Sequence, residues 1–149
     1  FEVRRTQPFR EKSAAANYSP GSLDGTRPGI FYTPIPNVET YNVFDKESLF
    51  LHEAIPGHHF QIALQQENEE LPSFRKTLWY SAYGEGWALY TEAMGKELGL
   101  FKDPYMYFGM LSSEIHRAIR LVVDTGLHSK GWKREQAIEY SLNNEANIC

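Results

Sequence analysis

Cysteine is almost absent from this chain of 149 residues, which has only Cys149 at its last position. A single thiol excludes a disulfide framework within the chain. It also excludes zinc fingers and zinc ribbons, because those sites need several thiolates around one ion. Imidazole and carboxylate groups are the zinc ligands that remain.

Basic runs and long apolar runs are missing as well. The net charge is -4 at pH 7, and lysine and arginine are scattered, so the electrostatic footprint of a nucleic-acid-binding protein is lacking. No apolar run approaches the ~18 residues of a membrane span, and there is no signal-peptide pattern. We therefore expect no nucleic-acid partner and no membrane span in this chain. The Gly-x-Ser-x-Gly turn of serine hydrolases is absent too.

The composition changes along the chain and predicts a mainly α fold. Residues 1–46 are rich in proline, glycine, serine and asparagine, which predicts an irregular, partly extended N-terminal arm with a short strand at residues 29–33. For residues 47–149 we predict a helical region. The chain starts without methionine and ends inside a helical pattern, so we expect a piece of a longer protein, with the remainder as its partner.

Apolar spacing and capping residues predict the helices of the second region. The first begins at Asp45 or Ser48, is interrupted at Pro56-Gly57 and resumes at residues 58–66. A second, long helix is predicted over residues 73–98. The third begins at Asp103 and ends near residue 127, and the fourth covers about residues 133–144.

Three histidines and a glutamate fall within eight residues, in the sequence His-Glu-Ala-Ile-Pro-Gly-His-His at positions 52–59. In the familiar zinc motif His-Glu-x-x-His, two histidines one helical turn apart bind the ion and the glutamate acts as general base. Here Pro56 stands four residues after His52, and the next histidines are His58 and His59. The alternative is that Pro-Gly ends one helix and the histidines are ordinary polar or core residues.

An unbroken helix would bring neither later histidine to His52. At ~100° and ~1.5 Å per residue, His58 would point ~120° away and His59 would lie ~10.5 Å along the axis. Pro56 removes the amide that would bond to the carbonyl of His52, and Gly57 tolerates unusual dihedral angles. We therefore predict a bulge at Pro56-Gly57 that makes His58, in preference to His59, the second ligand.

The second predicted helix offers a carboxylate for the third ligand position. Glu85 lies between Gly84 and Gly86, and two glycines would permit close approach of another backbone. Glu92 lies two turns further on, nearly on the same face, and is a candidate to orient a histidine. The alternative is a solvated helix face with glycines for helix packing, and it suits Glu92 better than Glu85.

A polar stripe follows one face of the third predicted helix, made by Arg117, Arg120, Asp124 and His128. In a functional interpretation, Arg120 binds a substrate carboxylate and His128 donates to a developing oxyanion, with Tyr140 as a further donor. The alternative is a salt-bridged surface. Tyr83 is a candidate for substrate contact, although packing is the commoner role of tyrosine.

Four ordered segments resemble a known family. They are Leu-Asp-Gly-Thr-Arg-Pro-Gly-Ile-Phe-Tyr at 23–32, the histidine cluster followed by Phe-Gln at 52–61, Gly-Glu-Gly-Trp-Ala-Leu-Tyr at 84–90 and Arg-Leu-Val-Val-Asp-Thr-Gly-Leu-His at 120–128. Over nearly its whole length the chain resembles the bacterial "domain of unknown function 885" family. Members of that family are several times longer, and many look like secreted or lipid-anchored proteins, which implies a periplasmic or other extracytoplasmic location.

That family is distantly similar to helical gluzincin peptidases such as carboxypeptidase Taq, thimet oligopeptidase and angiotensin-converting enzyme. The resemblance implies a zincin-like, mostly helical fold with a deep cleft. Carried over by position, it makes His52 the first zinc ligand, Glu53 the general base and Glu85 the third ligand.

The second ligand is where this chain departs from those peptidases, because Pro56 stands where they have histidine. Aligning the Gly-His of the converting-enzyme motif with the Gly-His of this chain selects His58. His128 and Tyr140 correspond to donors on the oxyanion side only by loose analogy.

The expected function is therefore that of a zinc-dependent metallohydrolase, in the first instance a peptidase, with a peptide or small amide as substrate. One alternative is a non-catalytic peptide-binding module with a degenerate peptidase fold. Another is a metal-dependent hydrolase of non-peptide amides or esters, because the same fold can support several reactions.

Overall fold

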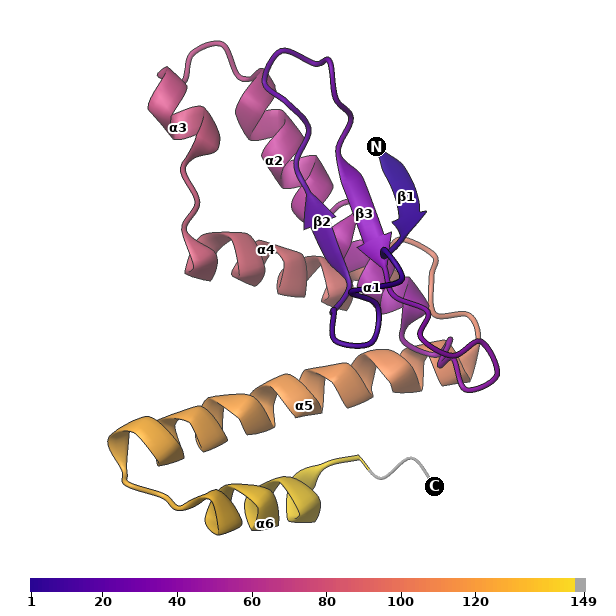
Figure 1. The fold of residues 1–149 in the computed structure, drawn as a ribbon, viewed down its shortest axis with the longest axis vertical. Coiled ribbons are helices and arrows are strands. Elements are labelled where there is room, and N and C mark those ends of the chain that lie inside the picture. Colours follow the sequence, from indigo (N-terminus) through magenta and orange to yellow (C-terminus); the bar gives the residue numbers. More distant parts are fainter. Residues whose placement is uncertain (147–149) are drawn as a thin grey trace.

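The N-terminal arm contains a small sheet. The computed structural model describes residues 1–146, so Cys149 lies outside the described residues. Three strands, β1 (Glu2–Arg5), β2 (Asn17–Ser19) and β3 (Ile30–Thr33), replace the single predicted one. β3 is central, parallel to β1 and antiparallel to β2 (Figure 1). The two other strands escaped prediction because β1 is exposed throughout and β2 is very short.

The first predicted helix is confirmed as two helices with an interruption between them. α1 (Lys46–Glu53) begins after Asp45, and α2 (His58–Glu67) follows four non-helical residues. The start of α1 agrees with Asp45, one of the two predicted capping residues, but the Asp45 side chain forms no capping hydrogen bond. The interruption lies where Pro56 and Gly57 predict it.

The single long helix predicted over residues 73–98 is wrong. The chain forms α3 (Ser73–Thr77) and α4 (Ser81–Ala93), and α4 is followed by a short 3-10 helix, η1 (Met94–Lys96). Between α3 and α4 the backbone is extended, which leaves the indole of Trp79 over Gly84, where a Cβ atom would collide with the ring. Apolar spacing cannot reveal such a break, because it depends on a contact between side chain and backbone.

The last two predicted helices are confirmed, and they form an antiparallel hairpin. α5 (Pro104–Ser129) begins at Asp103, whose carboxylate accepts a hydrogen bond of 2.9 Å from the amide of Tyr105. α6 (Arg134–Asn144) returns beneath α5 in Figure 1. In the turn between them, Trp132 packs against Gly126 of α5.

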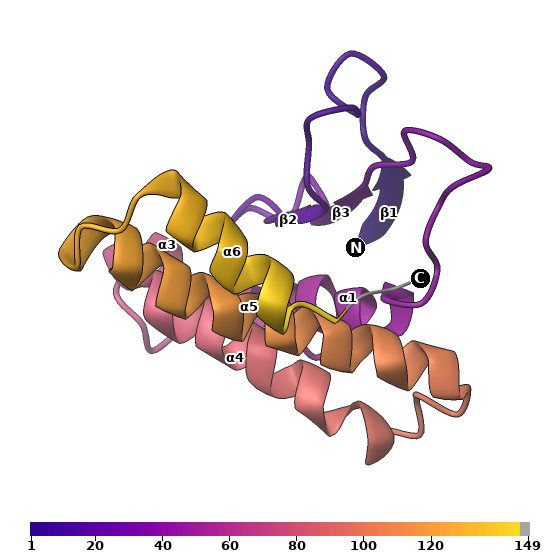
Figure 2. The same cartoon turned by 90° about the horizontal axis from the view of Figure 1, so that it is seen from below.

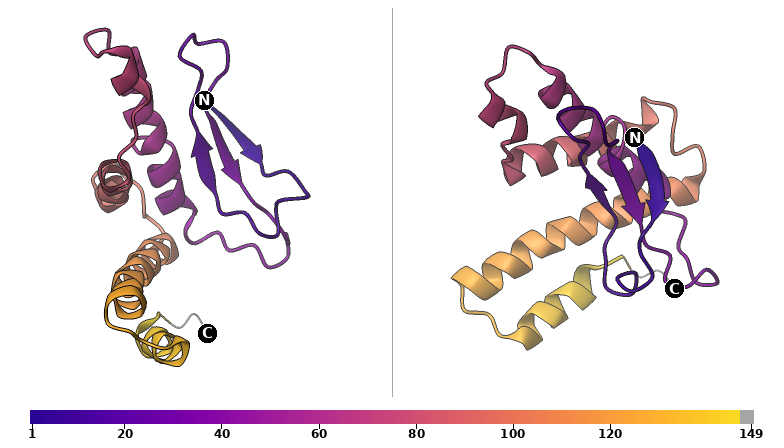
Figure 3. Two further views of the ribbon diagram at one scale, coloured as in Figure 1. Left: turned by 60° about the vertical axis from the view of Figure 1, so that its left-hand side comes forward. Right: turned by 45° about the horizontal axis from the view of Figure 1, so that its top comes forward.

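The elements form layers around α1. In the left view of Figure 3, α1 and α2 lie between the sheet and α4, and the α5–α6 hairpin lies below them. Figure 2 shows the sheet on one side of the helices. The core joins Leu51 of α1 to Phe101 and to Met110 of α5. α1 packs against α4, where the hydroxyl of Thr91 donates a hydrogen bond of 2.9 Å to the carbonyl oxygen of Leu51.

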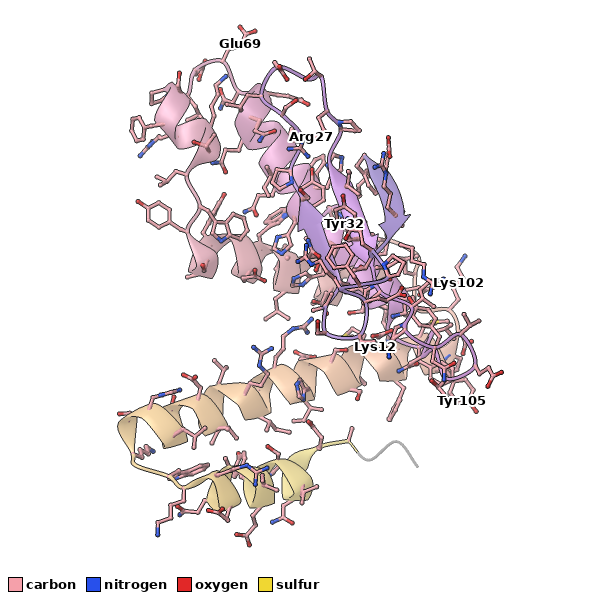
Figure 4. The ribbon with its side chains drawn as sticks, in the orientation of Figure 1. Lys12, Arg27, Tyr32, Glu69, Lys102 and Tyr105 are labelled. Carbon is pink, nitrogen blue, oxygen red and sulfur yellow. The ribbon has the colours of Figure 1, made fainter. Side chains whose placement is uncertain are left out.

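The arm is attached to the helices at the beginning of α5. There Tyr105, labelled in Figure 4, stacks on Phe44 with ring centroids 5.3 Å apart. The fold is mainly α, as predicted, with a small sheet in the arm. Among the described residues, no helix combines the length and the apolar composition that crossing a membrane requires.

Candidate metal site

The break between α1 and α2 turns the chain back onto the end of α1. A Cβ atom at Gly57 would collide with the backbone carbonyl oxygens of Leu51 and His52, so this close return requires glycine. The indole Nε1 of Trp87 donates a hydrogen bond of 2.7 Å to the carbonyl oxygen of Pro56, which attaches the break to α4. The break is therefore a packed feature of the fold and not a loose end of a helix.

This turn brings His58 beside His52. Their ring centroids lie 4.7 Å apart in an edge-to-face arrangement. Oε2 of Glu85, from α4, lies 3.3 Å from Nε2 of His52 and 3.6 Å from Nε2 of His58. One ligand atom from each of the three residues lies within 4.8 Å of the others. The structure thus brings together the three residues that the sequence predicts as metal ligands.

The chemistry of these three groups fits a zinc ion. Two imidazole nitrogens and one carboxylate oxygen are a donor set that zinc accepts, with a fourth position left for water or substrate. His58 is 7% exposed, whereas the side chain of Glu85 is more than half exposed. Among residues 1–146, Nδ1 of His58 is buried and has no hydrogen-bond partner. That imidazole is therefore not fixed by a hydrogen bond to a neighbouring residue.

His59 points to the other side of the helix. Its Nδ1 lies 2.8 Å from the hydroxyl oxygen of Tyr18 in β2, and its ring lies 4.5 Å from that of Phe1. These contacts hold His59 against the sheet. Of the two candidates for the second ligand, only His58 lies with His52 and Glu85.

A buried carboxylate holds the first histidine from behind. Oε1 of Glu92 lies 2.7 Å from Nδ1 of His52, and Oε2 accepts a hydrogen bond of 2.6 Å from the hydroxyl of Ser48. Arg117 of α5 binds the same carboxylate. Glu92 is 2% exposed, so the interpretation of Glu92 as part of a solvated face is wrong. Instead it orients a histidine, the role for which it was a candidate.

Glu53, the general base predicted from the sequence, lines the same cavity as His52, His58 and Glu85. Glu53 is 7% exposed. Burial raises the pKa of Glu53 above its ordinary value; the His52 imidazole and the backbone amide of Tyr18 oppose this, and nearby Glu85 adds to it. Such a carboxyl group holds a proton more readily than an exposed one.

The two clustered histidines differ in their titration. Burial lowers the pKa of His52, but the carboxylates of Glu92 and Glu53 outweigh burial and leave the pKa raised. Burial and the neighbouring His52 lower the pKa of His58, against a smaller opposing effect of Glu85.

These residues line a cavity of about 700 Å³. Its walls come from the segment that includes β2, from the end of α1, from α2, from α3 and the break that follows it, and from α4 and α5. The residues that line it include Tyr18, His52, Glu53, His58, Lys76, Trp79, Glu85 and Arg120. Trp79 closes one side, with its ring 5.5 Å from that of His58.

The structure brings only one of the remaining predicted residues to this cavity, namely Arg120. Tyr83 is 68% exposed and lines a separate cavity. The side chain of His128 is 78% exposed near the end of α5, 3.6 Å from Asp124. Tyr140 packs on Trp132 in the hairpin, with ring centroids 5.7 Å apart. The proposed oxyanion roles of His128 and Tyr140 stay predictions.

Two residues of the site escaped sequence analysis. Ser48 stands four residues before His52, so the two residues share a helical face, and this spacing could have indicated that Ser48 lies near the site. Trp79 carried no such signal, because its place depends on the break between α3 and α4.

The fold and the cluster define a mainly helical protein with two histidines and a glutamate gathered at one cavity. The chain matches the family model described as "Bacterial protein of unknown function (DUF885)" over residues 1–147, and it belongs to this family. None of the curated proteins compared matches it.

A solved structure from Colwellia psychrerythraea, described as "the putative lipoprotein", is similar to this chain. The two superpose with a TM-score of 0.89 at 42% sequence identity, and the match covers 97% of this chain and 25% of that chain. The present chain therefore spans about a quarter of the length of that protein.

Proposed function

We propose that this chain carries the zinc site of a metallohydrolase, and that the reaction is hydrolysis of a peptide or small amide. The observation that carries the proposal is the cluster of His52, His58 and Glu85, whose ligand atoms lie within 4.8 Å of one another. Glu53 lines the same cavity. The resemblance to helical gluzincin peptidases supports this choice of reaction.

His52, His58 and Glu85 would hold the ion. When bound, zinc supplies Lewis acidity and lowers the pKa of water at its open position. Glu92 keeps Nδ1 of His52 engaged at 2.7 Å, so that Nε2 is presented to the cavity. This arrangement selects one ring nitrogen of His52 for the ion.

Glu53 is the proposed general base. It accepts a proton from the attacking water and passes it to the amine that leaves when the carbon–nitrogen bond breaks. Its burial beside His52 keeps bulk water away from the carboxylate. The reaction consumes one water and needs no further reactant.

The proposed setting is extracytoplasmic. The description of the Colwellia protein as a lipoprotein supports this location. That protein is about four times as long as the matched region, so the proposed partner of this chain is the remainder of a longer protein. Segments outside this chain would complete the walls of the cavity.

The test uses the complete protein and compares Glu53→Gln with Glu69→Gln. Glu69, labelled in Figure 4, lies in the connection between α2 and α3 and is exposed, so the second variant makes the same chemical change away from the cavity. We expect Glu53→Gln to keep its zinc, measured by elemental analysis. Its turnover of a peptide library should fall by roughly 100- to 10,000-fold, while Glu69→Gln keeps both properties.

Full turnover in Glu53→Gln would contradict the mechanism. Absence of zinc from the wild-type protein, even after reconstitution with zinc, would contradict the site. A wild-type protein that holds zinc and binds peptides without cleaving any of them would be the non-catalytic module.

A further inference from the structure

An apolar groove, separate from the metal cavity, lies between α2, α3 and α4, which border it on three sides in Figure 1. Its volume is about 740 Å³. The large apolar and aromatic side chains that line it include Phe60, Leu64, Phe74, Leu78, Tyr80 and Tyr83. Each of these six is between 40% and 68% exposed, so in this chain the groove presents them to solvent.

The composition of the groove differs from that of a solvated surface. Among the described residues that line it, Arg75 alone carries a charge, and the uncharged polar ones are Gln61, Gln65 and Asn68. The cores of protein interfaces are likewise depleted in charged residues and enriched in aromatic ones. Monomers seldom expose a contiguous apolar patch of more than a few hundred Å². The groove therefore has the composition of an interface core.

The exposed area of the whole chain shows how much covering protein it can accept. The chain exposes 10290 Å², whereas a compact protein of its mass, 17.2 kDa, exposes about 7,800 Å². The excess of about 2,500 Å² is roughly three times the area that one partner buries in an interface of standard size. An excess of this size suits packing against a large amount of further protein better than a single contact with a second copy.

The relative from Colwellia psychrerythraea has that further protein in the same polypeptide. It superposes on 97% of this chain, but the match covers 25% of its own length. About three times as many of its residues lie outside the matched region as inside it. A segment of the same polypeptide also has a high effective concentration at the groove, because it is covalently attached.

The groove shares one wall with the metal cavity. Leu78 and Trp79 line both of them. The indole of Trp79 lies over Gly84 and 5.5 Å from the ring of His58. A segment bound in the groove would therefore contact the wall that packs on His58.

We propose that the groove between α2, α3 and α4 binds an apolar segment from the part of the longer protein that lies outside residues 1–149. The groove is thus an interface within one polypeptide, and Tyr83 is one of its contact residues. The inference concerns a surface separate from the histidine cluster and depends neither on zinc nor on turnover.

The first experiment measures the rate of thiol labelling in the complete protein, with its native cysteines, Cys149 included, replaced by serine. Phe74→Cys and Tyr83→Cys each place one thiol in the groove, and the same variant unfolded in urea serves as the reference for each position. We expect labelling at least about 100-fold slower in the folded protein, because a covered thiol reacts only when the interface opens. Circular dichroism and the thermal midpoint report whether each variant is folded. Hydroxyl-radical footprinting of Tyr80 and Tyr83 reads the same surface without any substitution.

The second experiment identifies the segment in the groove. The photo-cross-linking residue p-benzoylphenylalanine replaces Phe74 in the complete protein, and the cross-linked peptides are sequenced by mass spectrometry. We expect cross-links within a monomer, between position 74 and a segment outside residues 1–149.

Labelling in the folded protein at nearly the rate found in urea would overturn the proposal, because the groove would then be open. Cross-links that appear only in a dimer would assign the groove to a second copy and overturn it as well. Cross-links confined to residues 1–149, or slow labelling without any cross-link, would do the same. Each of these results would leave the proposed metal site standing, since none of them measures zinc or hydrolysis.

Discussion

His52 and His58 reach the same cavity but are held by different means. Nδ1 of His52 is bound by Glu92, which is also bound by Ser48 and Arg117. Nδ1 of His58 has no partner among residues 1–146, and its ring is instead buried against His52 and Trp79. One imidazole is thus oriented by a charged hydrogen-bond network and the other by packing.

The helices that carry the two histidines are also held differently. α1 is anchored in the core by Leu51, which is 1% exposed and whose carbonyl oxygen accepts a hydrogen bond of 2.9 Å from Thr91. α2 packs against α3 and α4, and it is joined to α1 by the close turn at Gly57. His52 is therefore held by a helix that is anchored in the core, and the turn at Gly57 determines where His58 lies relative to His52.

Substitution of Gly57 should have the largest effect, because the turn at this residue places His58 next to His52. In Gly57→Ala, the new Cβ atom would collide with the carbonyl oxygens of Leu51 and His52. Relief of such a collision costs about 3 kcal/mol, and we expect a lower thermal midpoint and loss of zinc in the complete protein. Thermal unfolding and elemental analysis measure the two effects.

The matched control for this change is Gly86→Ala in α4. A Cβ atom at Gly86 meets nothing within 4 Å. Within a helix the change from glycine to alanine stabilises by about 0.5–1 kcal/mol. If Gly57→Ala were as stable as Gly86→Ala and still held zinc, the close return of the chain would not be required.

Removal of the charge of Glu92 should weaken the hold on His52 and leave the packing of His58 in place. In Glu92→Gln the carboxylate that binds His52 and Arg117 becomes a neutral amide. We expect zinc affinity to fall about 10- to 100-fold, the usual effect of losing a group that orients a ligand. Competition with a chelator of known affinity measures this change.

Glu97→Gln is the control, because Glu97 is an exposed glutamate beyond η1. It should bind zinc like the unsubstituted protein. Equal affinity in Glu92→Gln and Glu97→Gln would show that the network does not support the ligand.

The smallest effect is expected for His128, which lies away from both His52 and His58. The side chain of His128 is 78% exposed and does not line the cavity. In His128→Ala we expect zinc affinity to change less than about 2-fold, as for an ordinary surface substitution. The same chelator competition applies, and a loss comparable with that of Glu92→Gln would place His128 at the metal.

Local signals in the sequence predicted much of the site. Pro56 and Gly57 alter the backbone where they stand, so the break that brings His58 to His52 could be predicted from them. Asp103 likewise marks a helix start, because its carboxylate caps α5; Asp45 precedes α1, but its side chain forms no capping hydrogen bond. These features depend on neighbours in the sequence, and the structure agrees with them.

Contacts between distant residues could not be predicted in the same way. Ser48 and Glu92 meet across 44 positions, so the burial of Glu92 has no local signal. The break at Trp79 depends on packing over Gly84 and against His58. The strands β1 and β2 depend on pairing with β3 and carry too few buried residues for an apolar alternation.

Elemental analysis of the purified complete protein tests the central claim most directly, with His58→Ala compared with His59→Ala. The two residues are adjacent, but His58 lies with His52 and Glu85 while His59 is held by Tyr18. The account predicts one zinc per chain in the unsubstituted protein and in His59→Ala, and loss of that zinc in His58→Ala. Zinc retained by His58→Ala, or lost equally from both variants, would contradict the proposed site.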